Sequence, residues 1–392
     1  MGAARTHGIL PDSHLKRLIA DGAISADRPI EDGQIQPASL DLRLGTKAYR
    51  LISSFLPERS ESSAQLNVLD LYESELVMYD FDLTQGAILE KGHVYLVPLL
   101  ERVALPPHVR GRANPKSSTG RLDIFTRLLT DLNAGFDEIP AGYRGPLYLE
   151  IVPRSFTIRV QTGLALNQLR LMTGRPAVSD SRLRALHRSA KLLYHNDEDL
   201  EESRPLAAQD VRVDHGLFLR VDLRGSGAGR EIVGYRAKKN SHVVDLSKTG
   251  HYSALDFWEP IYRQSNNVWK NNVCTLLLEP EEFYILSSHE RIKVPAGYAA
   301  EMVAYEAAFG ELRTHYAGFF DPGFGAVDGP RKGTQVVLEV RAHDVPFLIH
   351  DGQTFFKVVY EHMSDLPDHL YGASIGSSYH QQGLTLSKHF KS

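Results

Sequence analysis

Short runs of β-branched, aromatic and aliphatic residues recur along the chain and are separated by glycine and proline. Runs of this length, bounded by turn residues, are typical of strands. Regularly spaced short strands predict an all-β sandwich or barrel. The clearest predicted strands are residues 93–100, 145–152, 156–162, 281–287, 334–342, 345–351 and 355–363.

Two segments have helical periodicity instead. Residues 11–22 offer Asp12 or Ser13 as an N-cap and Gly22 as a stop, which together predict a short helix. Its apolar face would be formed by Leu15, Leu18 and Ile19.

The second helical pattern covers residues 179–203 and then dissolves into charged residues. Its apolar positions at helical spacing are Leu183, Leu186, Ala190 and Leu193. The segment from 174 to 205 is therefore predicted to connect two domains. These are an N-terminal barrel, residues 1–173, and a C-terminal barrel with a closing tail, residues 206–392.

The two halves repeat each other at an offset of 189 residues. The repeat predicts that one β-barrel unit has been duplicated in tandem. A weaker echo pairs residues 39–45 with residues 220–225. The matched pairs at the main offset are Glu90 with Glu279, Tyr95 with Tyr284, Glu101 with Glu290, Arg102 with Arg291, Pro106 with Pro295, Leu149 with Leu338, Glu150 with Glu339 and Gly163 with Gly352.

Composition narrows the functional classes. A chain of 392 residues can hold two full cores. The formal net charge of −4 argues against a nucleic-acid or membrane partner, and no apolar run approaches the roughly 20 residues that span a bilayer. The single cysteine, Cys274, excludes an internal disulfide and a cysteine-based zinc cluster, so we expect a cytoplasmic protein. The 17 histidines show no ligand spacing, and we assign none to a metal.

The segment KSSTGR, from Lys116 to Arg121, carries the residue types that bind an anion. Serine hydroxyls and loop amides donate to phosphate, and an arginine adds a charge-assisted contact. The matching stretch of the second half, YEAAFG, has Glu306 and Ala307 in place of Ser117 and Ser118. A carboxylate would repel phosphate, so we expect the anion site only in the first half.

Several motifs together resemble one family. They are KSSTGR, the AGFFDPGFG turn, an LE pair on a strand, SLDLRLG and a Y…QQG tail. This combination is similar to the dCTP deaminase branch of the dUTPase superfamily, in its tandem bacterial form. The resemblance implies two dUTPase-like distorted jelly-roll barrels, all-β dominated with a few short helices. It also implies a homo-oligomer, with sites between barrels in a trimeric ring, and dCTP bound with Mg²⁺ through its triphosphate.

The resemblance also assigns residues. It places the phosphate motif at Lys116, Ser117, Ser118 and Arg121, the catalytic glutamate at Glu150 or Glu339, the sugar-reading aspartate at Asp321 or Asp137, and the closing tail at Tyr371, Tyr379 and Gln382. Three features depart from the family pattern. Lys116 replaces an arginine, Ser378 stands where the tail carries a lysine, and six extra residues separate Arg121 from Glu150.

The chemistry follows from what the chain lacks. Zinc-dependent deamination needs H-x-E and P-C-x-x-C ligands, which are absent. A carboxylate must then take a proton from water and return it to the ring and the leaving group. Ser117 could orient that water, and Arg121 could stabilise the developing charge. Each residue also has a simpler interpretation: the glutamate as a solvent-facing strand residue, the serines as helix caps, Arg121 in a surface ion pair, Asp321 in a turn, and the tail as unstructured chain.

Two questions stay open at this point. A composite site would face Ser117 and Arg121 with Asp321 and Glu339, but a ring of three barrels cannot alternate two types. Homotypic rings favour Glu150, which shares a half with the phosphate motif, and we keep Glu339 as the alternative. Besides dCTP deamination to dUTP and ammonia, the sequence allows a dUTP pyrophosphatase, a bifunctional enzyme that forms dUMP, or a nucleotide-binding regulator without catalysis.

Overall fold

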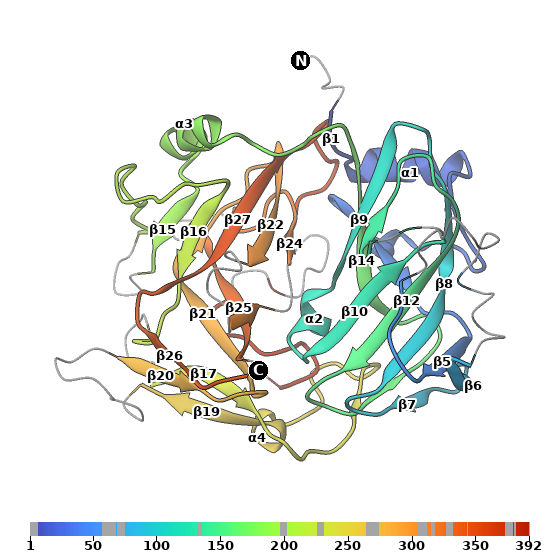
Figure 1. Ribbon diagram of the computed structural model, residues 1–392. Coiled ribbons are helices and arrows are strands. Elements are labelled where there is room, and N and C mark those ends of the chain that lie inside the picture. Colours follow the sequence, from blue (N-terminus) through green and yellow to red (C-terminus); the bar gives the residue numbers. More distant parts are fainter. Residues whose placement is uncertain are drawn as a thin grey trace.

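The computed structural model describes residues 7–56, 68, 75–131, 133, 135–196, 202–225, 231–263, 274–304, 312–314, 318–326, 332–342, 344–372, 379 and 382–391. Two strand-rich bodies lie side by side, one from each half of the sequence, and the C-terminus lies between them (Figure 1). The strands form small sheets that pair almost entirely antiparallel. The all-β prediction is therefore confirmed.

The first half contains two six-stranded sheets. One has the order β11-β9-β14-β4-β3, with β1 paired to β14. Its strands are β1 (Gly8–Ile9), β3 (Ile35–Gln36), β4 (Ser39–Arg43), β9 (Val109–Pro115), β11 (Glu138–Ile139) and β14 (Ala165–Thr173). The other has the order β10-β12-β8-β5-β6, with β2 paired to β8. Its strands are β2 (Ile24–Ala26), β5 (Lys47–Leu51), β6 (Val77–Asp82), β8 (Val94–Ala104), β10 (Ile124–Leu129) and β12 (Arg144–Pro153).

The second half is built in the same way. One sheet has the order β19-β17-β21-β25-β23, with β15 paired to β21, and the next has the order β16-β27-β22-β24. The first holds β15 (Leu193–His195), β17 (Ile232–Ala237), β19 (Trp258–Tyr262), β21 (Phe283–Ile292), β23 (Leu312–Thr314) and β25 (Thr334–Ala342). The second holds β16 (Leu217–Arg220), β22 (Tyr298–Ala304), β24 (Phe319–Phe320) and β27 (Thr354–His362). A further pair is β20 (Thr275–Leu278) with β26 (Phe347–His350).

A small sheet joins the two halves. Its central strand β13 (Ile158–Val160) pairs with β7 (Ala87–Leu89) and, in parallel, with β18 (Val244–Asp245) of the second half. The core of the first half also takes in second-half side chains, including Trp258 and Phe390. The two bodies therefore share apolar core.

The helices are short. They are α1 (Asp12–Ala20), the 3₁₀ turn η1 (Asp32–Gln34), α2 (Ser117–Gly120), α3 (Asp180–Ala190) and α4 (Ala254–Phe257). The predicted α1 is present with Leu15 fully buried, but its N-cap residue is Pro11 and not Asp12 or Ser13. The Asp12 carboxylate instead accepts hydrogen bonds from the backbone N–H of Asp368 and His369, so it ties the first helix to the second half.

The second predicted helix is shorter than its pattern. Helix α3 ends at Ala190, because Lys191 adopts a left-handed conformation with φ of 52°. Leu193, predicted on the helix, lies in β15 and pairs with Ile292 of β21. Part of the predicted connection thus belongs to the second barrel. No helix among the described residues is long and apolar enough to cross a bilayer.

The repeat recurs in the contacts. Tyr95 accepts a hydrogen bond at its hydroxyl from the backbone of Glu90, and Tyr284 accepts the same bond from Glu279, each at 2.9 Å. Glu101 binds the backbone and side chain of Arg43, and Glu290 binds Arg220 in the same way. These bonds make Arg220 the counterpart of Arg43. The predicted pairing of residues 39–45 with residues 220–225 is therefore wrong in register.

Candidate active site

A cavity of about 350 Å³ lies between the two halves. The first half contributes residues from β4, the end of β9 and α2, and the second half contributes residues from β24, β25 and the chain that follows β27. Among the residues lining it are Asp41, Lys116, Ser117, Ser118, Gly120, Arg121, Asp321, Glu339, Tyr371, Tyr379, Gln382 and Lys388. The structure therefore brings together most of the residues that the sequence singled out.

The phosphate motif forms a single helical turn after β9. Helix α2 spans Ser117–Gly120, and its cap position is held by Lys116 without a side-chain capping hydrogen bond. Both serines line the cavity. The interpretation of this pair as N-caps is therefore wrong, and the turn presents its first residues to the cavity. The matching YEAAFG stretch lies outside the described residues.

Arg121 links this turn to the C-terminal tail. Its side chain is buried, donates from Nη1 to the carbonyl of Thr385 at 2.9 Å and from Nη2 to Oε1 of Gln382 at 2.6 Å. The guanidinium carbon lies 3.7 Å from the centroid of the Tyr379 ring. Arg121 is thus not in a surface ion pair, and Tyr379 and Gln382 are not part of a loose tail.

Glu339 lies on β25 and is only 6% exposed. Burial raises the pKa of its carboxyl to about 8, which Asp123 reinforces and the positive charge of Arg121 opposes. The backbone of α2 approaches this carboxyl closely at Gly120, where an added Cβ would lie 2.9 Å from Cδ of Glu339. A glycine at this position allows the carboxyl to lie against the turn.

Asp321 lies in the same cavity and is held from the first half. Its Oδ1 accepts from Nη2 of Arg170 at 3.0 Å, and Arg170 is fully buried. Arg170 also donates from Nη1 to the carbonyl of Ala300 at 3.0 Å and lies over the ring of Phe319. Burial raises the pKa of Asp321, and Arg170 opposes that rise. Asp321 is thus more than a turn residue.

Two lysines and a further carboxylate also line the cavity. Lys116 forms an ion pair with Asp41, and Lys388 lines the cavity beside them. Burial and the charge of Lys116 both lower the pKa of Lys388. A second cavity of about 200 Å³ adjoins this cavity and shares Asp41, Lys116, Ser118 and Lys388. Sequence reasoning missed Lys388 and Asp41 as site residues, although Asp41 stands within SLDLRLG; Ser378 lies outside the described residues.

The first-half counterparts lie elsewhere. Glu150 is 1% exposed on β12 and accepts from Nε of Arg127 at 2.8 Å, and it does not line the cavity. Asp137 accepts from the backbone N–H of Leu128 at 2.8 Å, and burial raises its pKa to about 7. Within one chain, the structure therefore separates Glu150 and Asp137 from Ser117 and Arg121 and places Glu339 in the cavity with them.

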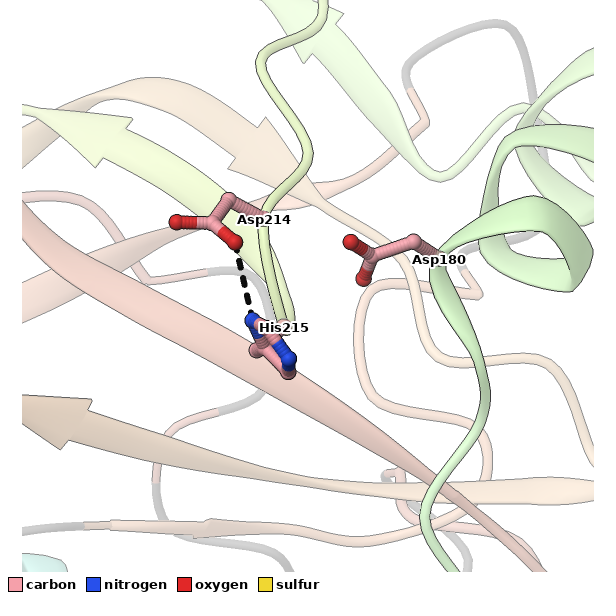
Figure 2. Close-up of side chains that lie close together, drawn as sticks. All are labelled: Asp180, Asp214 and His215. Carbon is pink, nitrogen blue, oxygen red and sulfur yellow. Dashed lines mark hydrogen bonds and ion pairs between the residues drawn. The ribbon is translucent and has the colours of Figure 1, made fainter.

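One surface group of the described residues could offer three metal ligands. Asp214 and His215 are joined at 2.8 Å, and Asp180 at the start of α3 lies across from them (Figure 2). The group lies outside the cavity, and Asp214 and His215 are exposed. Exposed acidic groups of this kind are common without an ion, so it adds no metal to the site.

The cavity joins the KSSTGR turn of one barrel to a buried carboxyl of the other, within a strand-dominated, dUTPase-like fold. Residues 6–175 match the model of the 2′-deoxycytidine 5′-triphosphate deaminase (DCD) N-terminal domain, and residues 179–390 match that of the DCD C-terminal domain. The chain therefore belongs to the 2′-deoxycytidine 5′-triphosphate deaminase family.

Individual proteins similar to this chain support the same family assignment. A crystal structure of 2′-deoxycytidine 5′-triphosphate deaminase from Agrobacterium tumefaciens is 44% identical, has a TM-score of 0.81, and the match covers 92% of this chain and 100% of that one. Two proteins described as dCTP deaminase, dUMP-forming, come from Sulfurihydrogenibium sp. and Parafrankia sp. and are 30% and 33% identical over 162 residues. Each match covers 41% of this chain and 81% or 74% of the relative.

Proposed function

We propose that the cavity between the halves catalyses the hydrolytic deamination of dCTP to dUTP and ammonia, with Glu339 as the acid–base group. The observation that carries the proposal is the place of Glu339: a buried carboxyl with a pKa of about 8, in one cavity with Ser117 and Arg121. A group that transfers protons in both directions works best with a pKa near the working pH.

The proposed reaction adds water to C4 of cytosine and then expels the amino group. Glu339 takes a proton from the attacking water as a new C–O bond forms at C4. Glu339 returns this proton to ring N3 and then transfers the proton of the new C4 hydroxyl to the amino nitrogen. The C–N bond breaks as ammonia leaves, and C4 becomes a carbonyl. One water is consumed and one ammonia is released, so no oxidant or reductant is needed.

Arg121 and Ser117 have distinct proposed roles. Arg121 is buried and fixed by the tail, so its charge is already in place where negative charge develops, which is the arrangement that stabilises transition states best. Ser117, at the first position of α2, can hold the attacking water. Asp321, held by Arg170, is proposed to accept a hydrogen bond from the deoxyribose 3′-hydroxyl.

We propose that the triphosphate lies toward Lys116, Ser118 and Lys388, which offer two ammonium groups and a hydroxyl. Mg²⁺ bound through the triphosphate would neutralise part of its charge. The donor set suits a hydrated cation as well, because Oδ1 of Asp41 is buried there without a hydrogen-bond partner. Tyr371, Tyr379 and Gln382 line the same cavity and are proposed to close over the bound triphosphate.

The proposal predicts that Glu339→Gln loses deamination by at least about a hundredfold, the contribution expected of general acid–base catalysis, and still binds dCTP. Glu150→Gln is the matched control, because it changes the equivalent residue of the repeat outside the cavity. We expect it to keep its kcat. Ammonia release gives the rate. Deamination by Glu339→Gln at the normal rate would overturn the assigned mechanism.

A second product is possible because the similar proteins from Sulfurihydrogenibium and Parafrankia are described as dUMP-forming. Separate measurement of ammonia, pyrophosphate, dUTP and dUMP from dCTP distinguishes the outcomes. Ammonia without pyrophosphate supports dUTP release, and equal amounts of both support dUMP formation. Pyrophosphate from dUTP alone would indicate a pyrophosphatase, and binding without any product would indicate a regulator.

A further inference from the structure

A buried ion pair joins the two halves two residues along β25 from Glu339. Nη2 of Arg341 on β25 donates to Oδ2 of Asp123, in the turn between α2 and β10. Ser155 donates to the same oxygen at 2.6 Å. Asp123 is fully buried and Arg341 is 3% exposed. The deamination chemistry proposed above uses neither residue.

The positions of this pair follow those of Arg121 and Glu339, whose charges interact across the cavity. Asp123 follows Arg121 by two residues, and Arg341 follows Glu339 by two residues on the same strand. Residues two apart on a strand point to the same face. The same two segments of chain thus approach each other at two successive points: in the cavity, where the charges of Arg121 and Glu339 interact, and at the buried ion pair of Asp123 with Arg341.

The backbone at Asp123 is adapted to this contact. Its φ is 55°, which is uncommon for residues other than glycine and tolerated best by asparagine and aspartate. Its backbone N–H donates to the carbonyl of Gly120 at 2.8 Å, and its own carbonyl accepts from Arg154 at 2.9 Å. The turn that carries Arg121 is therefore fixed by Asp123 through both its backbone and its side chain.

The repeat provides an internal comparison. At the offset of 189 residues, Arg341 corresponds to Val152. Strand pairing aligns Leu312 with Ile124, so Asp123 corresponds to Glu311, which lies outside the described residues. The other half therefore lacks the arginine of the pair. The arginine accompanies Glu339, which lines the cavity, and not its counterpart Glu150, which binds Arg127 instead.

We propose that Asp123 and Arg341 are positioning residues, which hold Glu339 against the phosphate-binding turn and balance the charge that its carboxyl experiences. This inference rests on the proposed function of Glu339. The negative charge of Asp123 favours the protonated carboxyl, and the positive charge of Arg341 offsets it. In a buried site, removing one partner exposes the carboxyl to the uncompensated charge of the other.

Other charged groups also face Glu339 and must stay constant in a test. Arg121 approaches it from the end of α2. The other ionisable groups around the cavity are Asp41, Lys116, Asp321, Tyr371, Tyr379 and Lys388. Substitutions at Asp123 and Arg341 leave all of these groups in place. Opposite shifts in the pKa of Glu339 caused by the two substitutions can therefore be assigned to the pair.

The test compares Asp123→Asn, Arg341→Gln and the double variant. The dependence of kcat/KM on pH reports ionisation in the free enzyme. We expect its acidic limb to move to lower pH by about one unit in Asp123→Asn and to higher pH by a similar amount in Arg341→Gln, as a nearby charge does. In the double variant, which has neither charge, the limb returns close to that of the unmodified protein.

A second readout does not depend on activity. The infrared band of a protonated carboxyl in the ligand-free protein is assigned to Glu339 by its loss in Glu339→Gln. Its titration should shift in the same directions as the acidic limb. Asp123→Asn keeps a side-chain oxygen that can accept from Ser155 and Arg341, so it is expected to fold; if Arg341→Gln does not fold, Asp123→Asn alone decides by the direction of its shift.

The outcomes separate the two proposals. If Glu339→Gln is inactive but neither single variant moves the limb or the infrared titration, or both move it in one direction, the positioning role is wrong and the proposed function stands. If Glu339→Gln deaminates dCTP normally, the proposed function fails, and the infrared titration still decides whether the pair controls the Glu339 carboxyl.

Discussion

Glu150 and Glu339 occupy the same place in two copies of one barrel but have different surroundings. Glu150 pairs with Leu96 across β12 and β8, and Glu339 pairs with Ile285, the residue 189 positions after Leu96. Glu150 is joined to the cation Arg127. Glu339 is buried with a raised pKa. The sequence could identify the two as equivalents, but it could not predict which one lacks a close ion-pair partner, because that depends on side chains distant in the chain.

The raised pKa of Glu339 has a consequence for stability. A carboxyl whose pKa is about 8 when folded and about 4.5 when unfolded binds more protons in the folded state between these values. The free energy of unfolding therefore falls as pH rises through this window, by up to about 1.4 kcal/mol per pH unit. We predict that the ligand-free protein loses stability from pH 5 to 8 relative to Glu339→Gln. Denaturant unfolding of both at several pH values checks this; parallel curves would contradict it.

At the scale of elements, the strands were predictable and their ends were not. Short runs of β-branched, aromatic and aliphatic residues located β8, β12, β21, β25 and β27. A separate helical pattern placed Leu193 on a helix, because it continues the spacing of Leu183, Leu186 and Ala190. Pairing with Ile292 overrides that local pattern. The predicted pairing of residues 39–45 with residues 220–225 is wrong for a similar reason. The correct register is shown by the bonds that the distant residues Glu101 and Glu290 form with each segment.

The contact between α2 and β25 leads to a prediction at Gly120. Gly120→Ala places a methyl group against the Glu339 carboxyl, which must then move. Because displacement of a catalytic group by about 1 Å can cost roughly a hundredfold, we expect kcat for dCTP to fall by about that factor. Gly297→Ala is the control, since its nearest heavy atom would be 4.0 Å away. Steady-state ammonia release measures both, and equal kcat values would show that the close approach is unimportant.

For the C-terminal tail the sequence allowed two interpretations, a segment that closes the site or unstructured chain. Phe390 packs against Tyr252, Phe257 and Trp258, and residues just before it reach Arg121. We predict that Phe390→Ala raises KM for dCTP by at least about tenfold, because the loss of a buried phenylalanine weakens the tail's attachment by several kcal/mol. The neighbouring exposed Lys391→Ala should leave KM unchanged. A normal KM in Phe390→Ala would mean that the tail is held by its other contacts.

At the scale of the whole molecule, the sequence could name the parts of the cavity but not which barrel supplies each. The objection that a ring of three cannot alternate two barrel types does not apply within a single chain. Within one chain, the interface between the two halves brings the turn at Ser117 into one cavity with Glu339 and Asp321. A trimeric assembly remains a prediction. The interface includes ion pairs, among them those of the partly buried Arg112 with the buried Glu301 and Glu361.

Arg170 joins this interface to Asp321, the residue proposed to bind the sugar, so its replacement gives the most direct test of the composite site. Arg170→Met leaves Asp321 buried without its partner, and breaking such a pair costs about 3–5 kcal/mol. We therefore expect a lower denaturation midpoint. Arg110→Met, on the neighbouring strand β9, is the control; Arg110 is bonded only weakly to the carbonyl of Gly174, at 3.4 Å, so its loss should cost about 0.5 kcal/mol or less.

The same variant separates a structural role from one in reading the sugar. If Asp321 accepts from the 3′-hydroxyl, its displacement should raise KM for dCTP by about tenfold, the value of one charge-assisted hydrogen bond. The KM for 2′,3′-dideoxycytidine triphosphate, which lacks that hydroxyl, should change little. A merely structural defect would weaken both substrates equally. Equal changes in the two KM values would therefore remove Asp321 from the sugar site, while a difference confined to dCTP would place a first-half arginine in control of a second-half contact with the substrate.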